Sequence, residues 1–576
     1  MKIIVFVTTL YLFPIFLFSQ IAKPNFEWVT TNGGSGSDMY DDLEIDSLGN
    51  VYTLGRFRGV VDLDPGSGVD THISKGYSDI FVQKLDSLGN LIWAKTFGGY
   101  TQLFEMGRDL HIDNNGDILI CGVFDSIVDF DPGVGVHDKA SLGIFDSFVL
   151  KLDSQGEFKW VYHLGSSTSY SNGFSLLTDA NNNVIVSGYY NGVLDFDSGS
   201  GQSNKNSYNN DNAYILKLSS NGEYIWAKEI GGNQFFTADV DILYSGIDDN
   251  SQLYFVGWYR QDCDFKPGTG VYYKTSTDWS TYDVFILSTD SNGVFNWVKT
   301  LNGVTPAKPK SFLIDNAGDL YISGFYQNSI DLNPGTANHI VTSIGAADGF
   351  IVKLNNQGEH LWSISQGCAK ADDMITSLDI DSDNNVFGVG TFYGDIDVDP
   401  GSSVFELSSP YGGIYVQKLN ESGNFLWAEK IDVGSFGNYL AYFIKVEESG
   451  NLYVSGRFEG AVDFNFGANP NYQSSNGLED VFVTKWSQHI PLSVHNHQMV
   501  DDFSMYPIPT TENLFIEFTT EELYTVRIYN GIGALVMSKS AHTSKMELDL
   551  KSITSGVYTI HVLSKGEIFR KQIIKF

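Results

Sequence analysis

A recurring Asp-x-Asp-Pro-Gly element carries the side chains in this sequence that are best suited to bind a metal ion. Its first carboxylate occurs seven times, at Asp62, Asp129, Asp195, Asp264, Asp331, Asp397 and Asp463. Calcium binds several oxygen ligands at once, so carboxylates two positions apart could contribute to a metal site. The candidate metal residues on this interpretation are Asp62, Asp64, Asp129, Asp131, Asp397 and Asp399.

The second position of the element favours a structural role instead. It is Lys266 in the fourth copy and Asn333 or Asn465 in two others, so the second carboxylate is lost where the first is kept. An aspartate ahead of a turn can accept backbone N–H groups, and Pro-Gly then sets the turn. We therefore interpret the first aspartate as a turn cap and expect no metal and no cofactor, with calcium binding as the alternative.

Two other motifs suggest metal sites but have simpler interpretations. The run from Asp379 to Asn385 is similar to the start of a calcium-binding loop, but the downstream glycine and glutamate of such loops are missing. His489, His495 and His497 lie in a polar stretch that is typical of a linker. The sequence contains no serine nucleophile elbow, phosphate-binding loop or zinc helix, and we predict no catalytic or cofactor-binding residues.

The elements that must position these residues form a long repeat. Its most regular mark is a glycine, at Gly55, Gly122, Gly188, Gly257, Gly324, Gly390 and Gly456. A tryptophan recurs with the same step, at Trp93, Trp160, Trp226, Trp297, Trp362 and Trp427. Repeats of this length are the signature of propellers and related arrays.

Each copy contains four runs in which apolar and polar residues alternate, the pattern of half-buried strands. In the second copy these runs are residues 107–113, 118–124, 146–152 and 157–163. Tight hairpins with Asn, Asp and Gly join the first pair and the last pair, whereas the middle connection is long and carries the acidic element. The sequence therefore predicts an all-β fold with a seven-bladed β-propeller over residues 20–487.

The two ends of the repeat array indicate that the ring is closed. The seventh copy stops at residues 481–487, before the strand that carries its tryptophan. That missing strand, residues 26–29 with Trp28, lies at the start of the chain. We expect it to complete blade seven and remove a free sheet edge. The tryptophans are expected to pack between blades.

A functional site in such a ring must break its symmetry. The strongest departures from the repeat are Trp258, Tyr259, Arg260 and Lys266 in the fourth copy. Arg108 is a further candidate, because it is expected near the entrance of the ring.

Composition and charge indicate an exported, acidic protein. Residues 1–19 have the basic start and apolar stretch of a signal peptide, and no later run is long enough to span a membrane. The net charge of −34 falls entirely on residues 20–498, a balance that disfavours nucleic acid as a partner. Three cysteines, Cys121, Cys263 and Cys368, occupy unrelated repeat positions and are expected to be buried and unpaired.

After a linker, residues 488–500, the chain predicts a small C-terminal β-sandwich over residues 501–576. Its motifs occur in order as Tyr506-Pro507-Ile508-Pro509, Tyr529-Asn530-Gly531-Ile532-Gly533, Asp549-Leu550, Gly556-Val557-Tyr558 and Lys571–Phe576. This module resembles the type A C-terminal sorting domain of the type IX secretion system. The repeats are similar to the bacterial β-propeller repeat (SBBP) family. The motif residues carried over are Tyr506, Pro507, Pro509, Asn530, Gly533, Gly556 and Tyr558.

The resemblance implies the type IX machinery as a partner, with a final location that is secreted or on the outer cell surface. Together with the repeat array it favours a binding or adhesion protein that holds a glycan or protein ligand on its elaborated face. The alternative is an extracellular polysaccharide-active enzyme with its site at the propeller centre, where residues from distant loops would meet.

Overall fold

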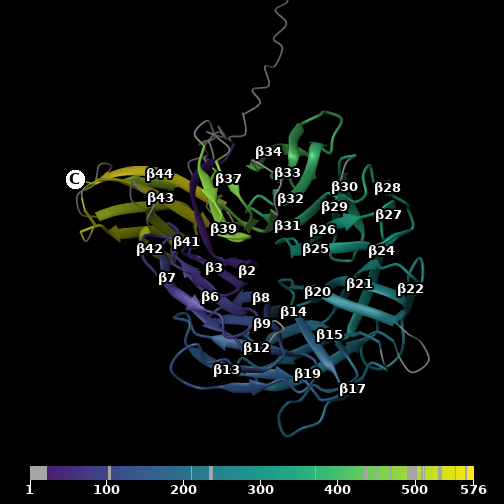
Figure 1. Ribbon diagram of the computed structural model, residues 1–576. Coiled ribbons are helices and arrows are strands. Elements are labelled where there is room, and N and C mark those ends of the chain that lie inside the picture. Colours follow the sequence, from purple (N-terminus) through teal and green to yellow (C-terminus); the bar gives the residue numbers. More distant parts are fainter. Residues whose placement is uncertain are drawn as a thin grey trace, which may run out of the picture. The chain divides into compact units, whose positions relative to one another are not determined.

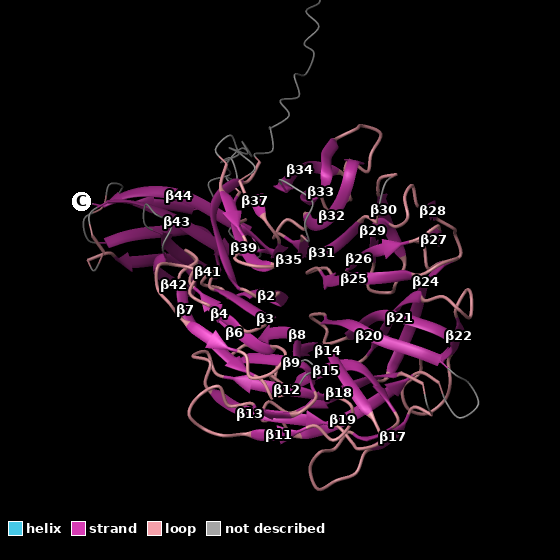
Figure 2. Cartoon of the chain, viewed as in Figure 1, coloured by secondary structure: helices cyan, strands magenta, loops and turns pink. Residues whose placement is uncertain are grey.

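The computed structural model describes residues 23–100, 105–208, 210–232, 238–369, 372–433, 439–447, 450–465, 470–488, 503–506, 510, 513–529, 535–551, 553–554, 556–564 and 567–575. The predicted signal peptide and residues 489–500 of the predicted linker lie outside these ranges. The chain divides into two compact units, Met1–Pro491 and Leu492–Phe576. The described residues form strands, turns and loops and contain no helix that could cross a membrane (Figure 2).

The first unit consists of seven four-stranded antiparallel sheets (Figure 1). Blades one to three comprise β2 (Met39–Ile45), β3 (Val51–Phe57), β6 (Asp79–Leu85) and β7 (Leu91–Phe97); β8 (Met106–Ile112), β9 (Ile118–Phe124), β12 (Asp146–Leu152) and β13 (Phe158–Leu164); and β14 (Tyr170–Thr178), β15 (Val184–Asn191), β18 (Asn212–Leu218) and β19 (Tyr224–Ile230).

Blades four to seven follow the same order. They comprise β20 (Ala238–Ile247), β21 (Leu253–Asp264), β23 (Asp283–Thr289) and β24 (Phe295–Gly303); β25 (Ala307–Ile314), β26 (Leu320–Tyr326), β29 (Asp348–Leu354) and β30 (His360–Gln366); β31 (Met374–Ile380), β32 (Val386–Asp397), β33 (Glu406–Leu419) and β34 (Phe425–Val433); and β35 (Leu440–Val446), β36 (Leu452–Phe458), β39 (Asp480–Ser487) and β1 (Asn25–Gly34).

The first strands of the blades line the centre of the unit. They contact one another in the cycle β2, β8, β14, β20, β25, β31, β35 and back to β2. Such a cycle requires a closed ring with these strands innermost, as Figure 1 shows. The predicted seven-bladed propeller is therefore confirmed.

The N-terminal strand completes the last blade. β1 pairs antiparallel with β39, with Phe26 opposite Trp486 and Trp28 opposite Lys485. This is the predicted closure, and it covers the outer edge that β39 would otherwise expose. The Trp28 indole Nε1 donates a hydrogen bond to the carbonyl oxygen of Ser87 in blade one, at 3.2 Å.

Three other tryptophans, Trp93, Trp160 and Trp362, repeat this contact between neighbouring blades. Trp93 donates to the carbonyl oxygen of Ser154 at 3.4 Å, and Trp160 donates to that of Ser220 at 3.1 Å. Each ring also covers the hairpin glycine of the next blade, where an added Cβ would lie 2.8 Å from Trp160 at Gly222. The predicted packing between blades is confirmed. Most of the rings are half-buried at hairpins, whereas Trp427 is buried within a core cluster.

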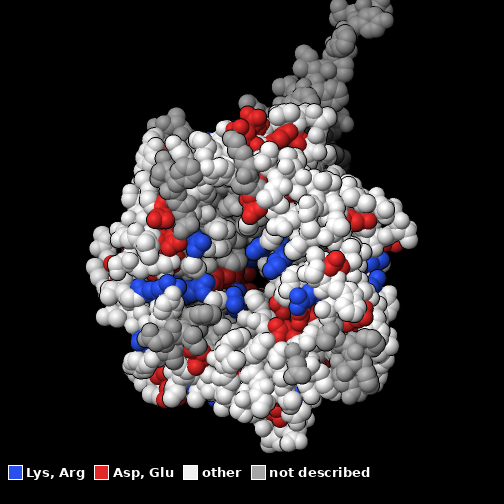
Figure 3. Space-filling model, turned by 45° about the vertical axis from the view of Figure 1, so that its right-hand side comes forward, with Lys and Arg blue, Asp and Glu red and all other residues white. Residues whose placement is uncertain are grey.

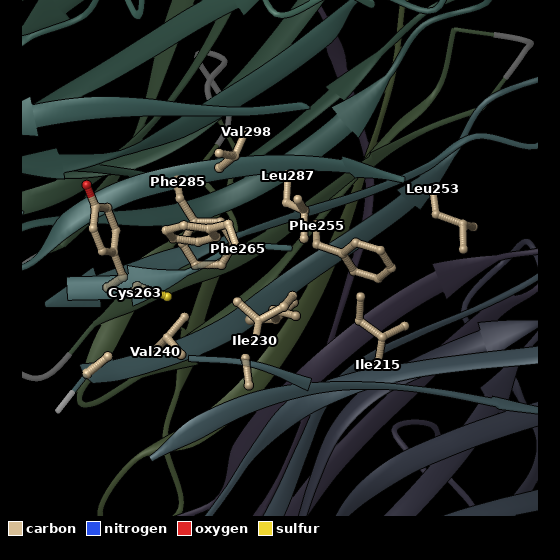
Figure 4. Close-up of a cluster of buried hydrophobic side chains, with 14 of the residues drawn as sticks. Ile215, Ile230, Val240, Leu253, Phe255, Cys263, Phe265, Phe285, Leu287 and Val298 are labelled. Atoms are coloured by element: carbon tan, nitrogen blue, oxygen red, sulfur yellow. The ribbon is translucent and has the colours of Figure 1, made fainter. Parts of the chain in front are cut away.

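The apolar cores lie between adjacent blades. Figure 4 shows one of them, in which Ile215 and Ile230 of blade three pack against Val240, Phe255 and Phe285 of blade four. Burial of such aliphatic and aromatic surface is the main force that holds the blades together. The three cysteines are buried and free, as predicted.

The long middle connections are more ordered than the predicted loops. In most blades they form a short two-stranded ribbon: β4 (Val60–Asp62) with β5 (Thr71–Ile73), β10 (Ile127–Asp129) with β11 (Asp138–Ala140), β16 (Val193–Asp195) with β17 (Asn204–Asn206), β27 (Ser329–Asp331) with β28 (Ile340–Thr342), and β37 (Ala461–Asp463) with β38 (Tyr472–Ser474). In blade four, β22 (Tyr273–Thr275) pairs with the end of β21, and in blade six the ends of β32 and β33 pair. Several ribbons also pair with the last strand of the preceding blade, for example β4 with β1.

The second unit is also all-β. Its strands are β40 (Phe503–Tyr506), β41 (Asn513–Tyr529), β42 (Leu535–Asp549), β43 (Gly556–Ser564) and β44 (Glu567–Lys575). They form one five-stranded sheet in which β41 pairs with β40 through its first half and with β43 through its second. A register break in the middle of β41 separates these halves, and the sheet folds as a half-barrel over its own apolar core.

The repeat glycine is required by a close approach of two backbones. A Cβ at Gly390 would lie 2.4 Å from the carbonyl oxygen of Met374 in the innermost strand and 2.7 Å from the ring of Tyr415. All seven repeat glycines face the carbonyl of the equivalent innermost residue in this way. The sequence signal that defines the repeat is therefore a packing requirement between the first two strands of each blade.

We expect Gly390→Ala to lower the free energy of unfolding by about 1–3 kcal/mol, the usual cost of overpacking a close contact. Gly388→Ala is the matched control, because it lies in the same strand and its added Cβ would meet nothing closer than 3.4 Å. That variant should stay within about 1 kcal/mol of the parent protein. Denaturant titration followed by tryptophan fluorescence measures both, and equal losses would contradict the backbone-approach argument.

Candidate functional site

Each innermost strand carries one extra residue directly after its close approach to the repeat glycine. In blade two, Gly107 pairs with Gly122 and Asp109 pairs with Cys121, which leaves Arg108 as the bulged residue. The bulged residues of the seven blades are Asp41, Arg108, Phe174, Leu243, Lys310, Thr376 and Tyr442. β-Bulges redirect side chains and often occur next to sites. Because these strands surround a central channel, the bulges place seven different residues around it. Six of them are half-buried, whereas Thr376 is buried.

The arginines of the propeller gather at one end of this channel. Arg56 and Arg457 directly follow repeat glycines, Arg58 and Arg260 lie three positions after them, and Arg108 is a bulged residue. No other arginine occurs between residues 20 and 487. Figure 3 shows a central hollow with Lys and Arg side chains around its edge and acidic side chains inside it. We call this end, where the middle connections begin, the channel mouth.

Arg108 has no ion pair among those formed by the described residues. Its guanidinium carbon lies 4.6 Å from the centre of the Phe174 ring, and its Nε has no hydrogen-bond partner among the described residues. Burial lowers its pKa, whereas the nearby Asp41 raises it. Asp41 is itself 3.7 Å from Arg56. A half-buried guanidinium without a close carboxylate has a desolvation cost that a bound anionic group would offset.

Blades four and five supply an aromatic part of the mouth. Trp258 and Tyr282 meet edge to face with ring centres 4.2 Å apart. Lys308 Nζ lies 5.7 Å from the Trp258 ring and 5.6 Å from the Tyr282 ring. Arg260 lies 5.2 Å from the Tyr282 ring and forms an ion pair with Asp239. Trp258, Tyr282, Arg260 and Lys308 are called the aromatic corner below.

Buried carboxyl groups at and below the mouth hold protons more tightly than usual. Burial, followed by the charge of Asp211, raises the pKa of Asp241 to about 8. Burial also raises the pKa of Asp41 to about 6 in spite of the nearby arginines. At neutral pH the Asp241 carboxyl is therefore largely protonated, which reduces the negative charge at the mouth.

Further along the innermost strands, polar contacts join neighbouring blades. Lys445 Nζ lies 2.7 Å from Glu44 Oε1, so blades seven and one are joined by an ion pair. Asp42 Oδ2 accepts the backbone N–H of Leu110 at 2.7 Å, which joins blades one and two. Asp109 Oδ2 likewise accepts the N–H of Leu176 of blade three at 2.6 Å. These contacts link the innermost strands of adjacent blades, although the Lys445 and Glu44 side chains remain 28% and 25% exposed.

The recurring aspartates have a different position and role. Asp129 Oδ1 accepts the backbone N–H groups of Asp131 at 3.1 Å and of His137 at 2.8 Å. The same two bonds, to the second and eighth residues onward, occur at the other six aspartates. These are the bonds that the turn-cap interpretation predicts.

The second acidic position contributes to the same turns. Asp131 Oδ1 accepts the N–H of Gly133 at 2.8 Å, and Asp64 does the same for Gly66 at 2.8 Å. Within the described ranges, no group of three or more His, Cys, Asp and Glu side chains is arranged to hold a metal ion. Calcium binding by these pairs stays a hypothesis for measurement in solution.

The remaining sequence candidates separate into three groups. Trp258 and Arg260 reach the channel mouth, as does Arg108. Tyr259 is buried in the core against Phe265, and Lys266 belongs to the ribbon, where its backbone N–H is bonded to Asp264. The run from Asp379 to Asn385 contains a hairpin in which Asp381 accepts the N–H groups of Asp383 and Asn385, as predicted. The histidines of the linker lie outside the described residues.

Sequence reasoning missed Tyr282, Lys308, Asp239 and Asp241. Only the chain fold brings them to the mouth, because they come from a connection and from the starts of two innermost strands. Alignment of the copies on the repeat glycine would have shown part of the signal. In each blade, one residue of the innermost strand pairs with the residue that follows the repeat glycine. This innermost-strand residue is methionine in three blades, but it is Lys308 in blade five and Asp241 in blade four.

Three of the carried-over sorting-domain residues are described. Tyr506 donates a hydrogen bond to Glu517 Oε1 at 2.5 Å, Tyr558 donates to the carbonyl oxygen of Thr554 at 2.7 Å, and Gly556 begins β43. These contacts hold strands of the second unit in register. Pro507, Pro509, Asn530 and Gly533 lie outside the described residues.

Comparison with known proteins identifies the C-terminal module. Residues 504–575 match the secretion system C-terminal sorting domain. The chain is therefore a cargo of the type IX secretion system and is exported to the outer cell surface. The match covers this module and leaves the propeller unassigned.

Relatives of the propeller are distant. An uncharacterized WD repeat-containing protein of Acanthamoeba polyphaga mimivirus is 22% identical over 521 residues, which cover 75% of this chain and 36% of that protein. Regulatory protein FlaEY of Caulobacter vibrioides is 26% identical over 117 residues, 20% of this chain and 12% of that protein. The chain thus spans about a third or less of the length of the curated relatives it matches.

The solved structures that match include one with low similarity. It is PorZ, described as an essential bacterial surface component of the type-IX secretion system of Porphyromonas gingivalis. The match covers 95% of this chain and 100% of that chain at 10% identity, with a TM-score of 0.17. A score this low carries no argument about this chain.

We expect the stability of the protein to fall as pH rises from about 5 to about 8. The pKa values of Asp41, Asp379 and Asp241 are raised by burial to about 6, 6 and 8, whereas an unfolded aspartate titrates near about 4. Across this window the folded state binds more protons than the unfolded state, so the free energy of unfolding decreases with pH. Melting temperatures across that range measure the effect.

Two controls separate this effect from general charge repulsion. Repulsion among the −34 net charges is screened by about 1 M NaCl, whereas the ionisation of buried carboxyls is not. Asp241→Asn should reduce the dependence of the melting temperature on pH near pH 8, where the Asp241 carboxyl ionises. A profile that becomes flat in high salt would contradict the assignment to buried carboxyls.

Proposed function

We propose that this protein is a binding or adhesion protein of the outer cell surface whose ligand, a glycan or a protein, is held at the channel mouth. One observation carries the proposal. The turn caps, the repeat glycine and the hairpin tryptophans are nearly uniform around the ring, whereas the seven bulged residues all differ. Residues that serve the scaffold are repeated in every blade, whereas the residues that bind an asymmetric ligand must differ between blades.

The side chains at the mouth suit recognition of a ligand. Arginine offers several donors in a planar fork, and aromatic rings offer flat apolar surfaces at low entropic cost. Trp258, Tyr282 and Phe174 supply such rings beside Arg260 and Arg108. Ligand sites commonly combine an apolar surface with a few well-placed polar groups.

The charge of the whole molecule narrows the range of ligands. A propeller that carries a net charge of −34 repels polyanions such as nucleic acid at long range. Its arginines nevertheless concentrate at one place, where they act over less than a Debye length, about 8 Å. This arrangement favours a ligand with a few anionic groups over one with dense charge.

The sorting domain supports the same proposal. It sends the chain to the outer surface, where the available ligands are extracellular polymers and the proteins of other cells. Binding there needs no cofactor or energy source.

An extracellular polysaccharide-active enzyme is a second candidate, and one observation favours it. Asp241 holds its proton near neutral pH, because burial raises its pKa to about 8, and a general acid needs this property. The two candidates differ in whether the ligand is cleaved. New reducing ends from a polysaccharide panel, absent with Asp241→Asn, would favour the enzyme, whereas intact ligand recovered after binding favours the binding protein.

The test of the binding proposal replaces mouth residues by those of other blades. Arg108→Leu introduces the residue that blade four carries at the same bulge, Leu243, and Arg56→Val introduces the equivalent of Val123 in blade two. The full mature chain and both variants are applied to an array of neutral and acidic glycans and to extracellular protein fractions. We expect each variant to lose about tenfold or more in affinity, because a charge-assisted hydrogen bond is removed.

Lys95→Met is the matched control, because Lys95 pairs with Glu157 at 3.0 Å on the outer strand of blade one, away from the mouth. It should bind as the parent does. If the ligands bind both mouth variants as tightly as they bind the parent protein, the binding surface lies elsewhere and the proposal is wrong.

A further inference from the structure

The aromatic corner differs from every other blade at the same positions. The residue after the repeat glycine is Arg56, Val123, Tyr189, Trp258, Phe325, Thr391 or Arg457, so tryptophan occurs there only in blade four. Tyr282, from the connection that precedes β23, lies against it with an interplanar angle of 68°. Both rings are half-buried, so part of each ring remains accessible. Together the two inclined rings form an apolar surface that a flat, ring-shaped ligand can contact.

Two cations complete the corner, and they are not equivalent. Arg260 is held by its ion pair with Asp239, so its charge is compensated. Lys308 comes from the next blade and forms no ion pair within 4.0 Å among the described residues. The charge of Lys308 acts on the carboxyl of Asp241, whose pKa is nevertheless raised by burial to about 8. Lys308 is therefore the cation available to a ligand.

This combination matches the chemistry of a sugar ring that carries a carboxylate. The C–H face of a pyranose is apolar and stacks on aromatic side chains, and the carboxylate pairs with an ammonium or guanidinium group. We propose that the aromatic corner is a subsite for a uronate unit of an acidic polysaccharide, with Trp258 and Tyr282 against the sugar ring and Lys308 at its carboxylate. This inference rests on the proposed function, since it names the ligand class of the channel mouth.

The structure supplies substitutions that another blade already tolerates. Lys308→Met introduces the residue that Met39, Met106 and Met374 provide at the same register position, opposite the residue after the repeat glycine. Trp258→Thr introduces the equivalent of Thr391 in blade six. Because both residues fit this backbone elsewhere in the ring, the variants should fold, and unchanged melting temperatures verify it.

A matched control removes the same contact outside the mouth. Lys228 Nζ lies 5.7 Å from the Trp226 ring, the distance found between Lys308 and Trp258, but on β19, the outermost strand of blade three. Lys228→Met therefore changes charge and lysine–aromatic contact equally and leaves the corner intact.

The experiment measures binding of the full mature chain to oligomers of galacturonate, glucuronate and mannuronate by titration calorimetry, each beside its carboxyl-reduced counterpart. We expect at least one acidic oligomer to bind, its reduced form to bind about tenfold or more weaker, and Lys308→Met and Trp258→Thr to lose about tenfold or more. Lys228→Met should stay within about twofold of the parent.

Several outcomes would overturn the inference. Equal binding of acidic and reduced oligomers would remove the carboxylate from the recognition. If Lys308→Met binds the uronate oligomers as tightly as the parent protein does, Lys308 does not bind the carboxylate. Failure of every uronate oligomer to bind would refute the subsite, and if another ligand on the array still depends on Arg108, the proposed function stands without it.

Discussion

The structure depends on one close approach, between the carbonyl of an innermost-strand residue and the repeat glycine of the neighbouring strand. A Cβ at Gly257 would lie 1.8 Å from the carbonyl oxygen of Asp241, and one at Gly122 would lie 2.1 Å from that of Met106. Directly after this contact, each innermost strand bulges by one residue. The glycine thus does two things at once. It lets the two strands pack, and it accompanies the bulge that places a side chain on the channel wall.

The rest of the scaffold holds this inner ring in place. The aspartates of the ribbons satisfy backbone N–H groups of long connections, which would otherwise order poorly. The hairpin tryptophans and the apolar cores join each blade to the next. The pairing of β1 with β39 then closes the ring through segments more than 450 residues apart in the chain. A rigid ring of this kind can tolerate different residues at the bulges, because no repeat contact depends on them.

The distribution of charge also distinguishes the channel mouth from the rest of the propeller. The propeller carries the whole excess of acidic residues, yet its arginines lie at one end of the channel. Several of them have carboxylate partners, such as Arg56 with Asp41 and Arg457 with Glu479 at 3.8 Å. Protonated carboxyls such as Asp241 and poorly compensated cations such as Arg108 and Lys308 leave the mouth less negative than the surrounding surface. The mouth is therefore the part of an acidic protein that an anionic group can approach.

The sequence was sufficient to predict the repeat, the all-β fold, the seven blades, the closing strand with Trp28 and the sorting domain. These follow from local patterns, since strand alternation, hairpin residues and fixed spacing are written in consecutive residues. It also determined that Asp129 and its equivalents cap turns, because the bonds involve residues only two and eight positions away. Which departures from the repeat reach the channel mouth depends on contacts between distant segments, and these appear only in the folded chain. Tyr259 and Lys266 looked as unusual as Trp258, but alternation along β21 and the path of the ribbon send them to the core and to the turn. Lys308 and Tyr282 join Trp258 from other strands and connections, and contacts between residues so far apart in the chain leave no pattern in the sequence of either segment.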